Sequence, residues 1–211
     1  MKIPIELENE LIEQENKIDS NGELPAYCRK KIHEIIKNLS DKEHRKSGYY
    51  RRSKLSICCS LSCMDIINTD MLGYSINLID KSISTLANEF NLSELEKLNN
   101  NYYTMSINLL DKDNPDFNIV AACLACNSAV NVILYDYDFS TLGVSEIESD
   151  PSNWTPSFYA SIAISGGAIW ETNNELDRRK NYWLWYLKKA LPYAWSTNMP
   201  LNIEYIKSNI L

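Results

Sequence analysis

The chain has 211 residues, of which 45% are hydrophobic, six are glycine and seven are proline, and its 28 acidic and 21 basic residues give a formal net charge of −7. This apolar content excludes a globally disordered chain, and the length suits a single domain whose scarce glycine and proline favour helices over a many-stranded sheet. Because the N-terminus lacks the apolar core of a signal peptide and no apolar run has the length needed to span a bilayer, we expect a soluble, cytoplasmic protein without membrane contacts.

The first half of the chain predicts a succession of amphipathic helices. Residues 5–18 are acidic and weakly periodic, compatible with a short helix or a frayed tail, so we separate an acidic N-terminal segment, 1–22, from a single domain, 23–211. Within this domain, apolar residues recur at spacings of three and four in four runs, 28–39, 55–66, 72–90 and 95–109. Ser93 and Glu96 have the spacing of a capping box, which predicts a helix that begins there.

The second half of the chain combines a buried helix, a long loop and shorter helical segments. Residues 117–135 are apolar on nearly every side, which is typical of a helix surrounded by others. Residues 136–157 lack helical periodicity, so we expect a long acidic loop. A short helix that extends to Trp170 and is interrupted at Gly166–Gly167 should follow, and the tail from 202 is weakly helical. These elements predict an all-α, single-domain multi-helix bundle of about seven or eight helices.

Residues 178–192 hold two of the five tryptophans and predict an aromatic core helix. Lysines occupy much of one side of this helix, and apolar residues fall on the opposite face at Trp183, Tyr186, Leu187, Ala190 and Ala194. Aromatic residues at this spacing usually pack inward. Pro192 lacks a backbone donor and crowds the preceding turn, so it should kink the helix or end it near Leu191.

Charge is distributed unevenly along the chain. Between Lys112 and Arg178 there are ten acids and no lysine or arginine, whereas residues 29–54 hold ten bases. A long acidic stretch attracts a basic partner, although a solvated acidic face that aids solubility gives the same pattern. The acidic total argues against RNA binding by residues 29–54, so we expect no nucleic-acid partner. The candidate partner-binding residues are the acids of the predicted loop, Asp136, Asp138, Glu146, Glu148 and Asp150.

The six cysteines and two histidines offer little catalytic chemistry. Cys59 and Cys63 lie one helical turn apart, and Cys123 and Cys126 have the spacing of a zinc or redox half-site, so two facing helices could bring four sulfurs together. Both pairs lie within apolar helical runs, where cysteine acts as a small hydrophobe. The histidines pair by spacing with no nucleophile, and we expect both at the surface or rim: His33 and His44. We therefore expect no metal, no cofactor and no catalysis.

The last third of the chain carries aromatic, glycine and arginine residues in a distinctive arrangement: Trp154, Phe158–Tyr159–Ala160, Gly166–Gly167, Trp170–Glu171, Arg178–Arg179, Trp183, Trp185–Tyr186–Leu187 and Ala190–Leu191–Pro192. An earlier helix adds Arg51–Arg52, Leu55, Cys58 and Cys63. In these residues the chain resembles the fifth-named all-α family of immunity proteins from bacterial polymorphic toxin systems. Tyr182 and Leu191 stand where that family's pattern has phenylalanine and valine.

The resemblance implies a cytoplasmic antidote that binds and neutralises a cognate toxin domain and has no catalytic activity. It does not identify the toxin, for which a nuclease is one possibility, nor the oligomeric state. Two other classes stay open: a metal-binding or enzymatic helical protein that uses the cysteine pairs, and a helical oligomeric scaffold. We interpret the signature residues as core and scaffold, with Arg178 or Arg179 pairing with Glu171 or Glu175: Trp170, Glu171, Arg178, Arg179, Trp183, Trp185, Tyr186 and Pro192.

Overall fold

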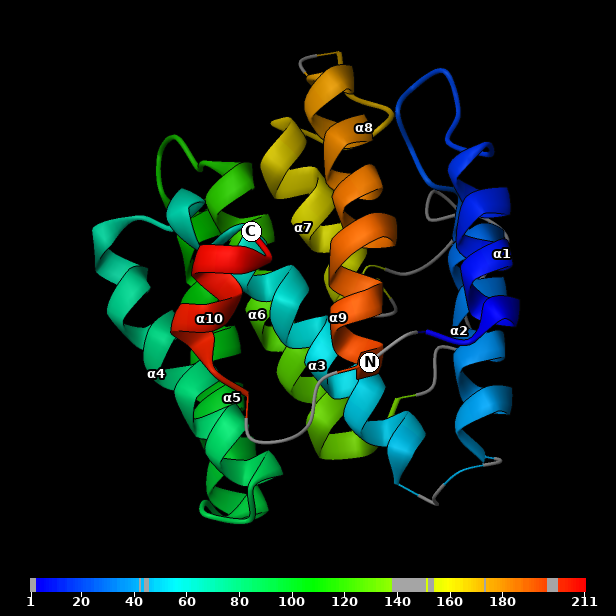
Figure 1. Cartoon of the computed structure of the whole chain (residues 1–211). Coiled ribbons are helices and arrows are strands. Elements are labelled where there is room, and N and C mark those ends of the chain that lie inside the picture. Colours follow the sequence, from blue (N-terminus) through cyan, green and yellow to red (C-terminus); the bar gives the residue numbers. More distant parts are fainter. Residues whose placement is uncertain are drawn as a thin grey trace.

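The computed structural model describes residues 3–41, 43, 46–137, 151, 154–172, 174–196 and 201–211. Over these residues the chain forms helices joined by turns, without a strand, which confirms the all-α prediction (Figure 1). The helices are α1 (Ile5–Glu15), α2 (Ala26–Asp41), α3 (Ser47–Ser62), α4 (Thr69–Leu86), α5 (Leu92–Asn108), α6 (Phe117–Tyr135), α7 (Pro156–Ser165), α8 (Leu176–Trp185), α9 (Leu191–Ser196) and α10 (Ile203–Asn209). Short 3₁₀ turns follow α3 and α5.

Helices α8 and α9 are joined by a π-helical turn into one rod, so the described residues form nine separate helices. The expected number was about seven or eight, and the difference lies at the two ends of the chain. Both weakly periodic terminal segments are helical, and each buries an apolar anchor: Leu7 in α1 and Ile206 in α10 are 0% exposed. A few well-placed apolar residues are enough to fix such a helix, because tertiary packing supplies most helical stability.

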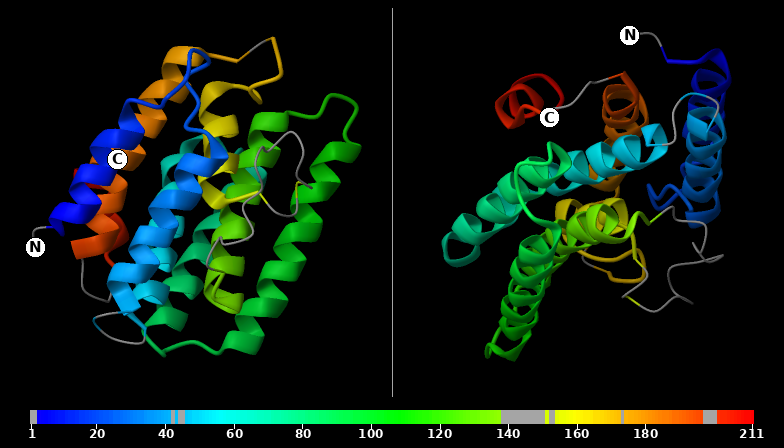
Figure 2. Two further views of the ribbon diagram at one scale, coloured as in Figure 1. Left: turned by 90° about the vertical axis from the view of Figure 1, so that its right-hand side faces the viewer. Right: turned by 90° about the horizontal axis from the view of Figure 1, so that it is seen from below.

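Helix α6 occupies the centre of the fold (Figure 2). It packs against α3, α4, α5 and α7. Its buried positions are mostly alanine, cysteine and valine. Side chains of this size let neighbouring helices approach closely, so one apolar helix can be covered on most of its circumference. The prediction of a buried helix over residues 117–135 is confirmed.

The length of α6 corrects one expectation from the sequence. Phe117–Tyr135 has 19 residues, and its most apolar stretch reaches a mean hydropathy of 1.8, so by length and composition it could cross a membrane. The expectation that no apolar run has this length is therefore wrong. In the folded chain 61% of that stretch is buried among the other helices, which is the environment of a core helix.

Several buried serines satisfy their hydroxyl groups within their own helices. Ser75, Ser82 and Ser106 each donate to the carbonyl four residues earlier, at 2.9, 2.7 and 2.8 Å. Ser60 and Ser161 donate to the carbonyl three residues earlier, at 2.9 and 2.8 Å. A buried hydroxyl without a partner is costly, so these local bonds allow a small polar residue to stand where helices approach closely.

The aromatic helix continues past Pro192. Helix α8 passes into the π-helical turn Tyr186–Ala190, in which the N–H of Leu191 bonds to the carbonyl of Tyr186, and then into α9. The wider turn makes room for the proline ring and for its missing donor. The sequence predicted that the helix kinks or ends near Leu191. The prediction of a helix end is wrong, and the regular α-helix is instead interrupted by a π-helical turn. The predicted apolar face is confirmed, since all five of its residues are at most 2% exposed.

The start of α5 differs from the predicted capping box. Asn91 is the N-cap, and its Oδ1 accepts from the N–H and the hydroxyl of Ser93 at 2.8 and 2.7 Å. The helix therefore begins at Leu92. Glu96 is turned to a different partner, because its Oε1 accepts from the hydroxyl of Tyr135 on α6 at 2.9 Å. Asn91 and Ser93 are both suited to cap the free N–H groups at the start of this helix, and Asn91 takes that position.

We predict that Trp183→Ala lowers the free energy of unfolding by about 3–5 kcal/mol, the range for a large aromatic side chain removed from a core. Trp183 is 0% exposed, whereas the control Trp170→Ala removes a ring that is 46% exposed and should cost clearly less. Chemical denaturation of both variants measures the difference. Equal denaturation midpoints for Trp183→Ala and the wild-type protein would contradict the assignment of Trp183 to the core.

Candidate functional site

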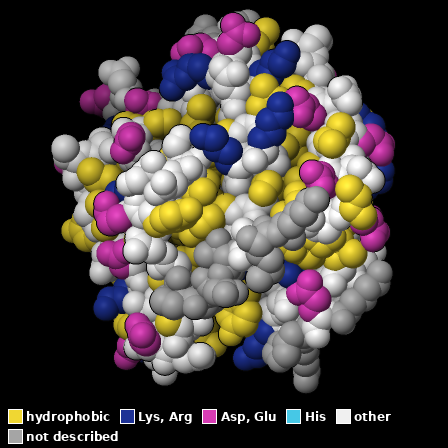
Figure 3. Space-filling model, in the orientation of Figure 1, with side chains coloured by type: hydrophobic (Ala, Val, Ile, Leu, Met, Phe, Trp, Pro, Cys, Tyr) yellow, Lys and Arg dark blue, Asp and Glu magenta, His cyan; other side chains and the backbone are white. Residues whose placement is uncertain are grey.

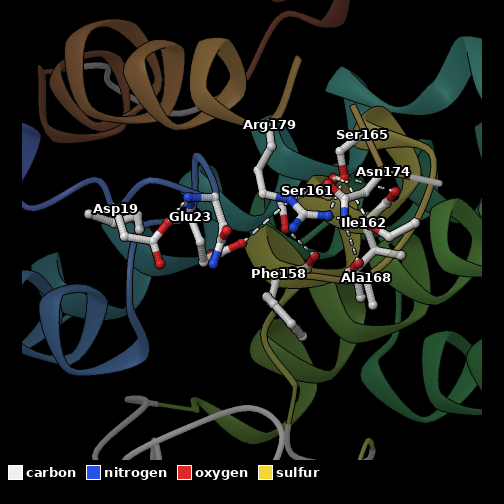
Figure 4. Close-up of polar contacts among 12 residues, drawn as sticks. Asp19, Glu23, Phe158, Ser161, Ile162, Ser165, Ala168, Asn174 and Arg179 are labelled. Carbon is white, nitrogen blue, oxygen red and sulfur yellow. Dashed lines mark hydrogen bonds and ion pairs between the residues drawn. The ribbon is translucent and has the colours of Figure 1, made fainter. Parts of the chain in front are cut away.

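A buried ion pair joins the turn before α2 to α7 and α8. The Nε of Arg179 lies 3.7 Å from Oε2 of Glu23, and the two side chains are 0% and 3% exposed (Figure 4). Arg179 also donates to the hydroxyl of Ser165 at 2.7 Å and to the carbonyl of Gly167 in the loop after α7. The predicted partners of the two signature arginines were Glu171 and Glu175, but the guanidinium of Arg179 pairs with neither of them. This arginine is instead an internal tie between segments far apart in sequence.

Arg29 is the second cation of this cluster. Its guanidinium is buried and lies over the rings of Phe158 and Trp183, at 5.3 and 5.2 Å from their centroids. Its Nε donates to the carbonyl of Leu24 at 3.1 Å and its Nη1 to the hydroxyl of Thr155 at 3.0 Å. Two aromatic residues of the family signature therefore enclose a cation. The local sequence around Arg29 does not mark it as buried.

Burial raises the pKa of the Glu23 carboxyl to about 7, because loss of solvation penalises its charged form more than the nearby Arg29 and Arg179 favour it. Among the described residues, neither carboxyl oxygen has a hydrogen-bond partner in good geometry. The same loss of solvation lowers the pKa of both arginines. The cluster is therefore a group of buried charged side chains in which the Glu23 carboxyl lacks hydrogen bonds from the described residues.

Two other signature residues order the surface around this cluster. Arg178 pairs with Glu175 at 2.9 Å, which confirms one of the predicted pairings. The carboxylate of Glu171 accepts from the N–H of Ala168 at 2.7 Å, and so fixes the loop that follows α7. Both contacts are local.

Trp170 departs from the prediction that the signature aromatics form the core. Helix α7 ends at Ser165, where Gly166 takes a left-handed conformation with φ 78°. The loop then carries the Trp170 ring back over Trp154 and Phe158, with centroids 5.8 and 6.4 Å apart. The ring remains 46% exposed, so the core assignment is wrong for this residue.

The cysteine pairs considered for metal binding approach each other inside the fold. Cys63, at the end of α3, is close enough to Cys123 and Cys126 of α6 for their charges to affect its pKa, and its Sγ lies 4.0 Å from the carbonyl oxygen of Ala122. All six cysteines are free and buried, and burial raises the pKa of each thiol. In the described part of the chain, no group of three or more His, Cys, Asp and Glu side chains could hold a metal ion.

The basic residues of α3 lie mostly inside the protein. Arg51, Arg52 and Lys54 are 8%, 6% and 4% exposed. The guanidinium of Arg51 lies 3.4 Å from the centroid of the Trp195 ring and pairs with Glu43 at 2.6 Å. Burial, with the charge of Arg51 nearby, lowers the pKa of Lys54 to about 8. Residues 29–54 therefore present fewer cations to solvent than their composition indicates.

His33 is also buried, at 4% exposed, and its Nε2 lies 3.4 Å from the hydroxyl of Tyr186. The expectation of a surface histidine is wrong here, because α2 turns this side toward the aromatic rod. His44 lies outside the described residues.

The structure places one of the five candidate acids. Asp136 ends α6 in the left-handed conformation, with φ 51°, and pairs with Arg52 of α3. Its side chain is 61% exposed, so the carboxylate remains available to a partner on its open side. The other four lie outside the described residues: Asp138, Glu146, Glu148 and Asp150.

An open groove of about 470 Å³ lies between α5, α6 and the start of α7. We call it the α5–α6 groove. None of its described lining residues is charged, and they include Asn100, Tyr103, Leu124, Asn127, Asn131 and Tyr135. Tyr103 and Tyr135 are 48% and 54% exposed. Exposed tyrosine beside amide side chains is typical of protein recognition surfaces. The one sequence signal for this groove is the run of asparagine and tyrosine over 99–103.

A second groove, of about 720 Å³, lies where α6 begins and the loop after α7 passes it. Phe117 and Trp170 line it and are 61% and 46% exposed, beside Asp116 and Glu171. The described lining of this second groove lies entirely within the stretch that has no basic residue, and α6 and α7 contribute residues from the same stretch to the α5–α6 groove. On the face drawn in Figure 3, by contrast, basic side chains gather over the region where Figure 1 labels α8.

These features define an all-helical domain whose interior holds the signature arginine and whose described surface offers amide and aromatic groups suited to binding another protein. The family model of immunity protein Imm5 matches residues 9–193, and the chain belongs to this family. The match extends the resemblance from the last third of the chain to most of its length. No curated protein matches the chain. Family membership gives the chain an immunity function, the binding and neutralisation of a toxin protein.

We predict that Glu23 makes stability depend on pH. The pKa of a glutamate carboxyl is ordinarily 4.5 and that of Glu23 in the folded protein is about 7, so between these values the folded chain holds a proton that the unfolded chain has released. Stability from this group is therefore present at low pH and is lost as pH rises toward 7. Between pH 5 and pH 7.5 the free energy of unfolding of the wild type should fall, relative to Glu23→Gln, by roughly 2 kcal/mol. Urea denaturation across this range measures it, and a constant difference would refute the prediction.

We also predict that folding needs neither zinc nor a disulfide, because the thiols are buried among apolar side chains with raised pKa values. Elemental analysis of the purified protein should find no stoichiometric zinc, and a chelator or a reductant should leave the unfolding curve unchanged. Loss of structure on chelation would overturn this prediction.

Proposed function

We propose that this chain neutralises a basic toxin domain in the cytoplasm by stoichiometric binding, and that acids at and after the end of α6 attract the toxin. Family membership supports the role of antidote. The charge distribution supports a basic partner. A toxin that acts on nucleic acid needs a positive cleft to hold phosphate, so a nuclease is the toxin class that fits best. Such a complex involves no catalysis by the antidote.

The observation that carries this proposal is the stretch 113–177, with ten acids and no base, which includes α6, α7 and the loop after α7. Because this stretch contains no lysine or arginine, none of its side chains repels a positively charged partner. Clustered carboxylates raise the rate of association with a cationic partner, and they do so most at low salt.

More basic than acidic side chains are buried, so the excess of acids is larger at the described surface than in the composition. Among the described residues two acids are buried, Glu10 and Glu23, against five bases, Arg29, Arg51, Arg52, Lys54 and Arg179. Leaving out these buried groups of the described residues, the remaining formal charge is more negative than −7. An approaching partner responds mainly to exposed charge, because solvent and fixed pairs screen the interior.

The metal-dependent or enzymatic alternative is disfavoured by the state of the cysteines. Thiol chemistry and zinc ligation both require the thiolate, which forms in electropositive and accessible surroundings. Every cysteine here is buried with a raised pKa. A helical scaffold without a toxin partner finds no specific support in the described surface.

We predict that neutralising the five candidate acids slows toxin association. The variant combines Asp136→Asn, Asp138→Asn, Glu146→Gln, Glu148→Gln and Asp150→Asn, and is tested against the toxin domain that the wild-type chain neutralises in cells. The association rate constant at low salt should fall markedly and lose much of its salt dependence. Asp136→Asn also removes the counter-charge of the buried Arg52, so Asp136→Asn alone is measured beside the full variant, and denaturation midpoints establish that both are folded.

The matched control removes five other exposed acids, so that net charge changes equally: Glu6→Gln, Asp65→Asn, Asp80→Asn, Glu89→Gln and Glu204→Gln. This control should keep most of the salt-dependent association rate. Unchanged kinetics and full cellular protection by the loop variant would show that the acids form a solvated face and that the toxin binds elsewhere.

A further inference from the structure

The floor of the α5–α6 groove is a chain of three asparagine amides. The Nδ2 of Asn99 donates to Oδ1 of Asn131 at 2.7 Å, and the Nδ2 of Asn127 donates to Oδ1 of Asn99 at 2.9 Å. Asn99 is 1% exposed and holds the other two amides in a fixed orientation. Within the described chain, the remaining Oδ1 of Asn127 and Nδ2 of Asn131 have no hydrogen-bond partner. The groove therefore offers one oriented acceptor and one oriented donor.

One end of the groove is both aromatic and acidic. The hydroxyl of Tyr135 donates to Oε1 of Glu96 at 2.9 Å, and the next residue is the exposed Asp136. The ring of Tyr137 stands edge-on to that of Tyr135, with centroids 6.3 Å apart. A half-exposed ring held by a carboxylate attracts a cation over its face.

We propose that the α5–α6 groove binds an extended segment of the toxin, with one peptide group on Asn127 and Asn131 and a lysine or arginine side chain over Tyr135. This inference rests on the proposed function. A peptide group presents one N–H and one C=O, which match the free acceptor and the free donor of the floor. A guanidinium or ammonium group presents donors only, so the cation belongs at the acidic end.

The groove and the acidic loop then have separate effects on binding. Long-range attraction by the loop acts on the association rate, whereas short-range contacts in the groove act on the dissociation rate. Aromatic side chains that lie in such grooves are common sites of large binding effects. The two contributions can therefore be measured separately with one toxin domain.

The first test removes the walls of the groove. Tyr103→Ala and Tyr135→Ala, singly and together, are compared with Tyr74→Ala, which removes an equally exposed tyrosine on α4 outside the groove. The probe is the purified toxin domain that the wild-type chain neutralises in cells, and binding kinetics are recorded at high salt. The double variant should raise Kd roughly tenfold to a hundredfold, mainly through faster dissociation, and the control should leave Kd unchanged.

The second test separates the amide floor from simple electrostatics. Asn131→Asp keeps the acceptor that Asn99 uses, removes the free donor and adds one negative charge. Attraction of a cation alone predicts equal or tighter binding by this variant. A peptide carbonyl seated on the Nδ2 of Asn131 predicts weaker binding in spite of the added charge, by roughly tenfold. Circular dichroism and denaturation midpoints establish that each variant is folded.

The outcomes distinguish this inference from the function on which it rests. Wild-type Kd in the Tyr103 and Tyr135 variants, or equal or tighter binding by Asn131→Asp, overturns the groove assignment while the antidote role stands. Absence of binding by the wild-type chain to this toxin domain overturns both. To locate the contact, a photo-crosslinking residue at position 103 should capture a toxin segment that carries lysine or arginine, and the same residue at position 74 should not.

Discussion

The burial of α6 on most of its circumference is the constraint on which the rest of the fold depends. A helix with 19 mainly small and apolar residues cannot be left at a surface, so it needs neighbours on several sides, and α3, α4, α5 and α7 provide them. Small side chains keep these neighbours close, and their serines bond internally. Between α5, α6 and the start of α7, asparagine and tyrosine join a few aliphatic residues along an open groove.

The second organising feature is the placement of arginines inside the protein. Arg29 and Arg179 lie with Glu23 in a core region walled by Trp183 and Phe158. Burying charges costs free energy unless they are paired and bonded, so this cluster is better explained as fixing the mutual position of α2, α7 and α8 than as a source of stability. Part of the family signature, Arg179, Trp183 and Tyr186 among them, therefore lies in the interior of the scaffold. The groups that could contact a partner lie elsewhere on the described surface, as in the α5–α6 groove.

The sequence predicted most of the helices and the inward face of the aromatic rod, because both depend on local spacing of apolar residues. It failed where the answer depends on contacts between distant segments. Nothing near His33, Arg29 or Arg52 indicates that another helix covers them. Pro192 predicted a disturbance, but the choice of a π turn over a helix end depends on packing against α3. Of the candidate acids, sequence alone could place Asp136 after a helix, but not opposite Arg52.

The inward placement of bases also bears on how an antidote can select its partner. Arg51 and Arg52 are used internally, and their counter-charges, Glu43 and Asp136, stay near the surface. An acidic exterior attracts many cationic proteins with little discrimination. Charge alone therefore speeds association but does not select one partner. Selectivity requires groups that are left unpaired by the wrong partner, and fixed amides of the kind seen at Asn127 and Asn131 meet that requirement. An antidote that must bind quickly and bind one toxin therefore needs both features, and at the end of α6 the exposed Asp136 follows directly on Tyr135, which lines the α5–α6 groove.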